Sequence, residues 1–393
     1  MAQALELAKG AIGRTEPNPR VGCVLGLETG EVLGEGATQA AGGPHAEVMA
    51  MRAAAAQGYS LKGATAWVTL EPCAHHGRTP PCCDALIAAG VSRVVAATND
   101  PNPKVAGAGF ERMRAAGIAV DTLEGPISLA AYELNIGFFS RMTRGRPWVR
   151  LKMAASIDGR TGLDNGVSKW ITSAEARHDG HRFRRRASAI LTGVGTVLAD
   201  NPRLDVRLQD ERVLDTEQPL RVIVDSALRT PPDAALLQAP GRALIVTCSE
   251  NPAQVSALTA VGADVLVMPG AGGQVDLAGL LQVLGKREVN ELHVEAGSIL
   301  STALLRSGLV DELLLYLAPC LLGGGRGLVS WPPLIGLHEG IALELIDCLR
   351  VGPDLRVLMK PDGGAARRSM DPGQRRQALH LGSAPYGDDT SCH

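Results

Sequence analysis

Short apolar runs alternate with amphipathic segments along the first 140 residues, which is the pattern of an α/β domain. The apolar runs predict strands at residues 21–27, 32–36, 66–70, 94–97 and 118–120, and a turn at Glu28-Thr29-Gly30 joins the first two. Helices are predicted at residues 1–9, 47–56 and 82–89, the last of them beginning just after Pro80-Pro81. His45 and Glu47 therefore lie at the start of the second predicted helix.

A second α/β pattern follows Thr143-Arg144-Gly145-Arg146-Pro147, a stretch that we interpret as a linker between two domains. Its predicted strands cover residues 148–154, 189–192, 220–224, 243–247, 264–268, 291–295 and 312–318, and a hairpin at 341–349 and 355–360 closes it. Its predicted helices cover 174–186, 277–284 and 298–307. We therefore expect domains at 1–143 and 147–360, followed at 361–393 by a disordered tail that is rich in Gly, Arg, Ser and Asp.

Composition and charge narrow the class of protein. The 393 residues carry a formal net charge of −2, without the basic excess that nucleic-acid or membrane-surface binding usually requires. No stretch is apolar over the roughly 18 residues of a membrane span, and residues 1–9 do not resemble a signal peptide. The eight cysteines are scattered apart from three near one motif, which suits a reducing compartment. We expect a cytoplasmic protein that binds neither nucleic acid nor membrane.

That motif contains the ligands of a hydrolytic zinc site. His45, Cys73 and Cys82 offer one imidazole and two thiolates, and a catalytic zinc site has three protein ligands and an open fourth position. Glu47 is then free to move protons, as in the H-x-E…P-C-x-x-C zinc deaminases of nucleobases. The alternative is a closed structural site with Cys83 as fourth ligand, although adjacent ligands strain the geometry and leave Glu47 without a role. Chemistry alone does not decide between Cys82 and Cys83.

The spacing of the cysteines carries a further signal, because eight residues separate Cys73 from Cys82 instead of two. The run from Thr69 through Cys73 and from His75 to Cys82, with the upstream Asn18-Pro19-Arg20-Val21-Gly22, resembles the bifunctional riboflavin-biosynthesis family, in which a pyrimidine deaminase is fused to a reductase. The resemblance extends to about residue 360. It implies an N-terminal cytidine-deaminase-like α/β/α domain and a C-terminal dihydrofolate-reductase-like α/β domain.

For the first half, the resemblance implies Zn²⁺-dependent deamination of 2,5-diamino-6-(5-phosphoribosylamino)pyrimidin-4-one to 5-amino-6-(5-phosphoribosylamino)uracil, and it selects Cys82 over Cys83. The implied substrate contacts are Asn18, His76, Arg78 and Asn102, each of which could instead only stabilise a loop. Arg78 would lie near the substrate phosphate, because a guanidinium suits that anion.

In the second half, three segments suggest a nucleotide-dependent reductase: 151–160, 190–202 and 294–300. The third ends a strand in Gly297-Ser298 before a helix, and a helix N-terminus favours a pyrophosphate. No G-x-G-x-x-G fingerprint follows the first predicted strand of this half, so the dinucleotide-binding motif of Rossmann folds is absent there. We interpret Gly323-Gly324-Gly325 as a flexible turn.

The same resemblance implies that this half reduces the ribosyl group to ribityl with NADPH. The implied cofactor contacts are Ala154, Trp170, Thr196, Asp200, Ser226, Gly297, Ser298, Ile299, Leu300, Ser301, Thr302 and Ala303. The implied substrate contacts are Ser168, Arg184, Leu204, Arg207 and Glu295, and Lys152 is a further candidate. Arg184 and Arg207 are natural phosphate partners, although the run Arg182–Arg186 could be a solvated helix face.

Two other classes of protein remain as alternatives: a nucleic-acid or nucleoside deaminase with a passive second domain, and a zinc-stabilised scaffold without turnover. The long cysteine spacing and the near-neutral charge argue against the first, and a free Glu47 argues against the second. The expected partners are small phosphoribosyl pyrimidines, and the resemblance implies a homo-oligomer.

Overall fold

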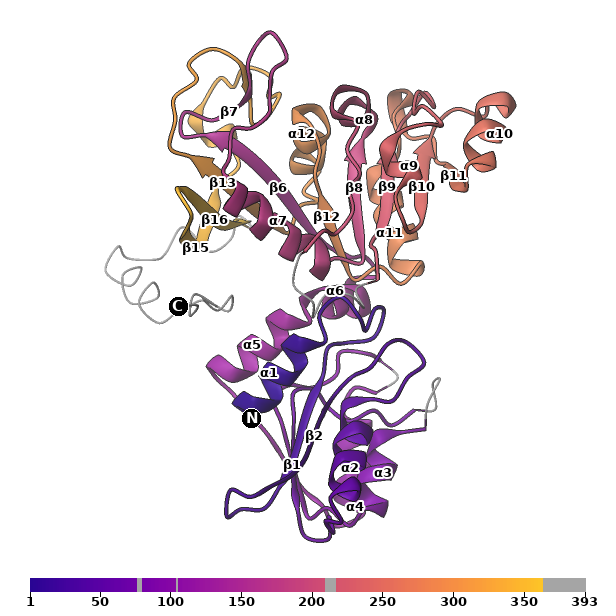
Figure 1. The fold of residues 1–393 in the computed structure, drawn as a ribbon, viewed down its shortest axis with the longest axis vertical. Coiled ribbons are helices and arrows are strands. Elements are labelled where there is room, and N and C mark those ends of the chain that lie inside the picture. Colours follow the sequence, from indigo (N-terminus) through magenta and orange to yellow (C-terminus); the bar gives the residue numbers. More distant parts are fainter. Residues whose placement is uncertain (76–79, 104, 209–216, 363–393) are drawn as a thin grey trace. The chain divides into compact units, whose positions relative to one another are not determined.

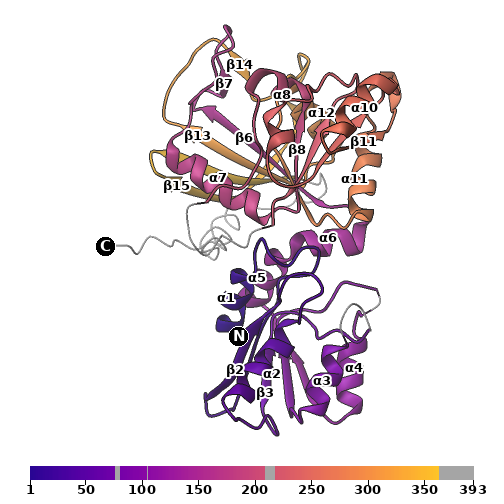
Figure 2. The ribbon, with the colours of Figure 1, turned by 45° about the vertical axis from the view of Figure 1, so that its right-hand side comes forward.

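The computed structural model describes residues 1–75, 80–103, 105–208 and 217–362. The chain forms two compact units, and Met1–Pro147 makes up most of the first while the second is built on the chain from Trp148 onward (Figures 1 and 2). The predicted disorder of the tail is wrong for its first two residues, because Pro361 ends strand β16 (Asp354–Pro361) and the amide of Asp362 donates to the carbonyl of Ala342 at 2.9 Å. Residues from 363 onward lie outside the described part of the chain.

The first unit is a five-stranded sheet between two layers of helices. Its strand order is β2-β1-β3-β4-β5, with β1 antiparallel to β2 and β3, and β3, β4 and β5 parallel. The strands are β1 (Gly22–Gly26), β2 (Val32–Ala37), β3 (Thr65–Val68), β4 (Arg93–Ala96) and β5 (Ala119–Thr122). Helices α1 (Ala2–Gly10) and α5 (Pro126–Leu134) lie on one side of the sheet, and α2 (Ala46–Ala56), α3 (Cys82–Ala88) and α4 (Ala108–Ala115) lie on the other (Figure 1).

Two glycines explain how closely the helices approach this sheet. A Cβ atom at Gly22 would lie 1.9 Å from the carbonyl oxygen of Ala4 in α1, and one at Gly36 would lie 2.5 Å from Cβ of Met49 in α2. Any other residue would force the helices outward, so glycine at these strand positions sets the position of α2 over the sheet. Helix α2 is the one that begins beside His45.

The predicted linker begins too early. Helix α6 (Ile136–Arg144) includes Thr143 and Arg144 in its last turn and ends at Gly145, whose φ of 69° is the left-handed conformation of a helix C-terminus. The sequence pattern also did not predict α4, α5 and α6, because α4 has only eight residues, three of them charged, and α5 and α6 have only nine residues each. Every strand predicted for this unit is present within two residues of its predicted ends.

The second unit is a nine-stranded sheet in the order β11-β10-β9-β8-β12-β6-β13-β16-β15. The strands from β11 to β13 run parallel, and β16 and β15 add an antiparallel hairpin. Its main strands are β6 (Trp148–Ser156), β8 (Ala189–Gly193), β9 (Leu220–Val224), β10 (Ala243–Thr247), β11 (Ala263–Val267), β12 (Glu291–Val294), β13 (Glu312–Ala318), β15 (Leu343–Val351) and β16 (Asp354–Pro361). The predicted α/β class is therefore confirmed for both units.

Helices pack against this sheet through two apolar clusters. Phe183 of α7 (Ala174–Arg186) packs with Leu314 and Tyr316 of β13. The α8 side chain Val197 packs with Ile190 and Ile223 of the neighbouring strands. The remaining helices are α8 (Val194–Asp200), α9 (Ala235–Gln238), α10 (Pro252–Ala260), α11 (Leu277–Lys286) and α12 (Ser298–Arg306), of which α8, α9 and α10 were not predicted. A small sheet pairs β7 (Arg160–Gly162) with β14 (Arg326–Gly327).

The basic run in α7 is only partly a solvated face. Arg182 is exposed, whereas Arg186 is buried and its Nε lies 2.7 Å from Glu291 Oε2. The same glutamate lies 3.0 Å from Arg150, which is also buried and stacks near Phe183. Buried charges that are paired in this way bind the helix to the sheet. The arginines of α7 therefore lie in two environments: Arg182 faces solvent, and Arg186 faces the sheet.

Across the described residues, no helix combines the length and the apolar character needed to cross a bilayer.

Candidate active sites

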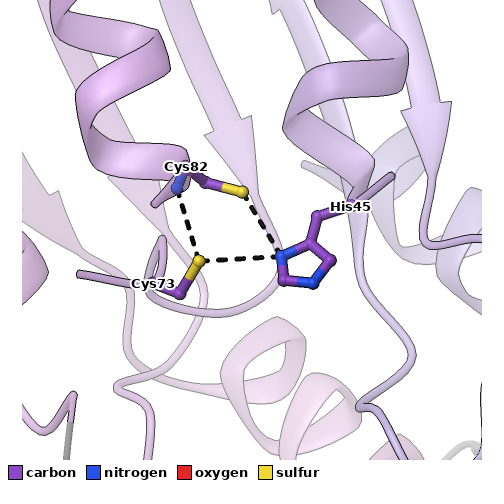
Figure 3. A group of neighbouring side chains, drawn as sticks. All are labelled: His45, Cys73 and Cys82. Atoms are coloured by element: carbon purple, nitrogen blue, oxygen red, sulfur yellow. Dashed lines mark hydrogen bonds between the residues drawn. The ribbon is translucent and has the colours of Figure 1, made fainter. Parts of the chain in front are cut away.

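Three predicted zinc ligands converge in the first unit. Nδ1 of His45 lies 3.6 Å from Sγ of Cys73 and 3.4 Å from Sγ of Cys82, and the three ligand atoms are within 4.8 Å of one another (Figure 3). One imidazole nitrogen and two sulfurs match the preference of Zn²⁺, and the spacing suits a tetrahedral site. In the described part of the chain this is the group of metal-ligating side chains that could hold an ion.

Two helix beginnings and one loop bring these ligands together. His45 is the N-cap residue of α2, Cys82 is the first residue of α3, and Cys73 lies in the loop after β3. The backbone N–H of Cys82 donates to Cys73 Sγ at 3.3 Å, so one helix N-terminus directly stabilises a thiolate. The local sequence predicts this arrangement because Pro80-Pro81 stops the preceding chain and α3 begins immediately afterwards.

Cys83 points elsewhere. Its side chain is fully buried among the apolar residues around Leu86 and Val94, and its thiol lies 3.7 Å from Asp84 Oδ1. The closed structural site with Cys83 as fourth ligand therefore has no support in the geometry. The described residues leave one coordination position without a protein ligand, as a catalytic zinc site requires.

The two ligand thiols differ in acidity. Hydrogen bonding from Cys82 and His45 lowers the pKa of Cys73 to about 4 despite burial. The hydrogen bond to Cys73, together with burial, raises the pKa of Cys82. A divalent cation would favour the thiolate of both, because metal binding requires deprotonated cysteines.

Glu47 is a buried carboxyl in the first turn of α2, with 4% of its surface exposed. Burial, reinforced by the negative charge of Cys73, raises the pKa of Glu47 to about 7. A carboxyl group with a pKa near neutrality can both accept and return a proton, which is what general acid–base catalysis requires.

A cavity of about 430 Å³ joins these groups. Its lining includes His45, Glu47 and Cys73 and also Asn18 and Asn102, two of the predicted substrate contacts. The other two predicted contacts, His76 and Arg78, lie outside the described residues. The volume is sufficient for a small heterocycle, since ligand pockets begin at about 300 Å³.

Two residues of this cavity were missed by the sequence analysis. His75 lines it, and its buried Nδ1 has no hydrogen-bond partner among the residues that the structure describes. Asp100 also lines it, and burial, with a smaller contribution from Glu71, raises the pKa of this carboxyl to about 7. Its place in the insert between Cys73 and Cys82 was a signal for His75, but the sequence alone could not show that this residue lines the cavity.

In the second unit, the predicted residues gather at one edge of the sheet. Glu295 and Gly297 follow β12, Thr196 follows β8 and Ser226 follows β9, while Ala154 and Lys152 lie within β6. These strands are parallel, so their carboxyl ends face the same side, where open α/β sheets bind ligands.

Glu295 interacts with the cationic side chains Arg184 and Lys152 at these carboxyl ends. Arg184 donates to it from Nε at 2.5 Å and from Nη2 at 2.9 Å, a bidentate pair. Burial opposes ionisation of the glutamate, but Arg184 and Lys152 hold the pKa of Glu295 well below its usual value. Burial in turn lowers the pKa of Lys152, which Glu295 partly restores.

Two of the remaining predicted substrate contacts, Leu204 and Arg207, lie on the segment after α8. Leu204 is buried, with a φ of 50°, and the next carbonyl, that of Asp205, accepts from Arg184 Nη1 at 3.0 Å. Arg207 is exposed, and its Nε lies 3.2 Å from Asp205 Oδ1. Its backbone N–H donates to His181 Nδ1 at 3.2 Å, so a residue that the sequence analysis did not name orients it. Ser168 is partly exposed on the loop after β7.

The predicted cofactor contacts divide into exposed and inward-facing side chains. Trp170 and Ile299 are 70% and 79% exposed. Ser301 and Thr302 are buried, and their hydroxyls bond to the carbonyl of Ala296 and the amide of Ser330. The amide of Gly297 donates to Thr196 Oγ1 at 3.2 Å, which brings two of the three predicted segments into contact. Asp200 ends α8. The other members of α12 in this group are Ser298, Leu300 and Ala303.

The glycine-rich run at 323–325 does not offer all its amides to a phosphate. Asp158 accepts from the amides of Leu322 and Gly323, the latter at 2.8 Å. Hydrogen bonding from Ser156 and from these amides lowers the pKa of Asp158 to about 2. The carboxylate therefore occupies the position of an anionic ligand, in agreement with the interpretation of this run as a turn.

Taken together, the fold and the two sites define a two-domain α/β enzyme in which a zinc deaminase is joined to a reductase. Two family models match the chain: "Cytidine and deoxycytidylate deaminase zinc-binding region" over residues 1–98, and "RibD C-terminal domain" over residues 147–357. The chain belongs to the RibD family of riboflavin-biosynthesis proteins.

Curated relatives and solved structures agree with this membership. The chain is 47% identical to RibD of Escherichia coli, covering 90% of this chain and 96% of the relative, and 42% identical to RibD of Haemophilus influenzae, covering 92% and 97%. It is similar to the structure of Acinetobacter baumannii RibD, with 40% identity, a TM-score of 0.83 and coverage of 92% and 97%. A Thermotoga maritima deaminase/reductase structure matches with 33% identity, a TM-score of 0.81 and the same coverage.

The resemblance that the motifs indicated is thereby confirmed. The protein is a bifunctional enzyme of riboflavin biosynthesis that acts on small molecules, a hydrolytic deaminase and an oxidoreductase whose cofactors are zinc and NADPH.

Proposed function

We propose that the cavity of the first unit deaminates 2,5-diamino-6-(5-phosphoribosylamino)pyrimidin-4-one to 5-amino-6-(5-phosphoribosylamino)uracil. The observation that carries this proposal is the convergence of His45, Cys73 and Cys82 beside a buried Glu47 in one cavity. The three ligand side chains hold Zn²⁺, which when bound supplies Lewis-acid activation of water. The related Thermotoga maritima protein is a diaminohydroxyphosphoribosylaminopyrimidine deaminase, which supports a substrate of this chemical class.

Glu47 moves the protons of this reaction. Water adds at the ring carbon that carries the exocyclic amine, and the C–N bond to that amine breaks to release ammonia. The Glu47 carboxylate accepts one proton from the attacking water and passes it to the ring nitrogen, and it then carries the proton of the added hydroxyl to the leaving amine. Asn18, His75 and Asn102 are polar groups at the cavity wall that orient the heterocycle. We assign the substrate phosphate to Arg78, and His76 remains a candidate contact.

We further propose that the second unit reduces the ribosyl group of the deaminated product to ribityl. When bound, NADPH supplies the reducing equivalents. Lys152 and Glu295 face the sugar from the carboxyl edge of the sheet, and the ion pair with Glu295 keeps Arg184 oriented. Arg184 and Arg207 hold the phosphate, with Ser168 and Leu204 completing that subsite.

The cofactor lies across the same edge in this proposal. The predicted contacts from Ala154 to the start of α12 border the carboxyl ends of β6, β8, β9 and β12. A bound nicotinamide nucleotide would also cover Trp170 and Ile299, two large apolar side chains that the described chain leaves exposed.

The broader assignments follow from these activities. We assign the deaminase domain to residues 1–144, one residue beyond the predicted end at 143 because α6 ends at Arg144, and the reductase domain to 147–360, in a cytoplasmic homo-oligomer that does not bind nucleic acid. The near-neutral net charge argues against nucleic-acid binding. The cysteines, which form no disulfide among the described residues, support the cytoplasmic location.

One coupled assay tests both halves. The purified protein is supplied with the diaminopyrimidine ribotide, zinc and NADPH, and ammonia release and nicotinamide absorbance are followed separately. We expect ammonia first and substrate-dependent NADPH oxidation afterwards. Ammonia release without oxidation would contradict the reductase proposal, and absence of both signals from zinc-loaded protein would contradict both proposals.

A pair of adjacent substitutions tests the ligand assignment. We expect Cys82→Ser to lower the zinc content per chain and to abolish ammonia release, because a hydroxyl replaces a thiolate ligand. Cys83→Ala should keep its zinc and its activity, and should lower the free energy of unfolding by about 1 kcal/mol through lost packing. Metal analysis of both purified variants checks this, and retained zinc in Cys82→Ser would contradict the assignment.

A further inference from the structure

Glu71 is a buried carboxylate, 3% exposed, that pairs with neither a metal-ligand group nor a cationic side chain among the described residues. Four backbone amides donate to it instead. Oε2 accepts from Asp100 N at 3.2 Å and from Gly107 N at 3.0 Å. Oε1 accepts from Gly109 N at 3.1 Å and from Phe110 N at 3.4 Å. A buried carboxylate is stable in this setting because several N–H groups replace its water shell.

The carboxylate takes the place of a helix cap. Helix α4 begins after Gly107, which has no side chain to cap the exposed amides. Glu71, 38 residues earlier in the chain than Gly109, accepts from the amides of Gly109 and Phe110, the second and third helical residues. These are the amides that an N-cap side chain normally satisfies, and a negative charge at this end also stabilises the helix.

The same side chain binds the loop that enters the cavity. Glu71 Oε2 holds the amide of Asp100, and Asp100 Oδ1 in turn accepts from the amide of Asn102 at 2.8 Å. Asp100 and Asn102 both line the cavity of about 430 Å³. Through its two oxygens, Glu71 therefore anchors the cavity loop at Asp100 and at the start of α4.

A close backbone contact adds to this anchor. A Cβ atom at Gly109 would lie 2.1 Å from the carbonyl oxygen of Pro72 and 3.2 Å from Glu71 Oε1, so only glycine permits the approach. Pro72 directly precedes Cys73, a member of the metal-ligand group. Three consecutive residues thus have connected roles: Glu71 binds the cavity loop and the start of α4, Pro72 contacts Gly109 of α4, and Cys73 offers a thiolate to the metal.

We infer that Glu71 is a positioning residue of the deaminase reaction: its carboxylate fixes Asp100 and Asn102 in place relative to the metal ligand Cys73. This inference rests on the proposed deaminase activity of the cavity. Glu71 borders the cavity, but both of its carboxylate oxygens accept from backbone amides, so we give it no direct bond to the substrate. It acts through the loop, so its loss alters how the heterocycle is held, more than how the metal is bound.

The test is Glu71→Gln in the full-length, zinc-loaded chain. The glutamine keeps the size of the side chain, but its NH₂ group faces amides that need an acceptor. We expect KM for ammonia release to rise by about tenfold to a hundredfold, the range that a displaced positioning group produces, with a smaller change in kcat. Zinc per chain and NADPH oxidation with the deaminated product should not change. Amide hydrogen exchange at Gly107, Gly109 and Phe110 should become faster.

Glu111→Gln is the matched control, because it makes the same charge change on the exposed side of the same helix. It should behave like the wild type in every measurement. Gly109→Ala is the second test variant: it keeps the carboxylate but pushes α4 away from Pro72, and it should also raise KM.

Two results would overturn the inference. Zinc loss with an unchanged KM would mean that Glu71 only supports the metal ligand, and faster amide exchange with unchanged KM would mean that it is only a helix cap. Loss of NADPH oxidation in Glu71→Gln would show that this variant does not fold. In that case Gly109→Ala tests the inference, and an unchanged KM for ammonia release in Gly109→Ala would also overturn it. Wild-type protein that releases no ammonia would instead contradict the proposed function itself.

Discussion

Replacing Glu47 by glutamine is expected to lower ammonia release by about 10²- to 10⁴-fold, the contribution of a positioned general acid–base group. Glutamine fills the same space in the first turn of α2 but cannot accept the proton of the attacking water. Because Glu47 is not among the metal-ligating side chains, the variant should retain its zinc. Initial rates of ammonia release at saturating substrate, with metal analysis of the same preparation, provide the measurement.

The reductase half supplies the internal control for this experiment. NADPH oxidation with the deaminated product should be equal in Glu47→Gln and wild type. Should the variant keep more than about a tenth of the ammonia-releasing activity, another group must move the proton. Asp100 would be the candidate, since it is the other carboxyl in the cavity whose pKa burial raises to about 7, and Asp100→Asn would then be the decisive comparison.

Glu295→Gln is expected to inactivate the reductase and to destabilise the second unit by about 3 kcal/mol, because breaking an ion pair that is largely shielded from water leaves its partner uncompensated. Arg184 loses a bidentate carboxylate, and Lys152 loses the charge that favours its ammonium form. Urea unfolding at pH 7 measures the loss of stability, and NADPH oxidation with the deaminated product measures the loss of activity. Ammonia release should continue at temperatures where the chain remains folded.

The effect of pH on this variant has a definite sign. The folded-state pKa of Glu295 lies well below the ordinary value of 4.5, so its ionised form stabilises the fold above that pH. As the pH falls below 4.5 towards the folded-state pKa, this contribution is lost, and the stability difference between wild type and Glu295→Gln should shrink. A difference that stays constant from neutral pH down through this range would contradict the ion-pair argument.

Two comparisons make the stability measurement specific. Glu344→Gln changes an exposed glutamate of β15 and should leave the free energy of unfolding within about 0.5 kcal/mol of the wild type. The double variant Arg184→Met with Glu295→Met should lose less stability than the two single changes together, because it removes both charges of the pair. Additive losses would show that the two residues do not interact.

Local patterns were sufficient to predict the order of most elements and the family. Strands such as β9, β10 and β13 have the predicted ends because each is a short run dominated by apolar residues, even where it includes Arg221 or begins with Glu312. Residue type and spacing were also sufficient to predict a zinc site with His45 and Cys73, whereas the choice of Cys82 over Cys83 came from the family resemblance. Short or charged helices such as α4 and α8 were missed because their apolar periodicity is too brief to detect.

The tertiary structure decided everything that depends on which side chains face each other across the chain. Whether Cys82 or Cys83 joins His45, and whether His75 lines the cavity, depends on how α3 and the described part of its preceding loop are oriented. The bond from Glu71 to Gly109 and the pair of Arg184 with Glu295 span 38 and 111 residues. Such contacts leave no periodic signature in the sequence, because they form only when packing brings distant segments together, and burial then determines their energy and their pKa values.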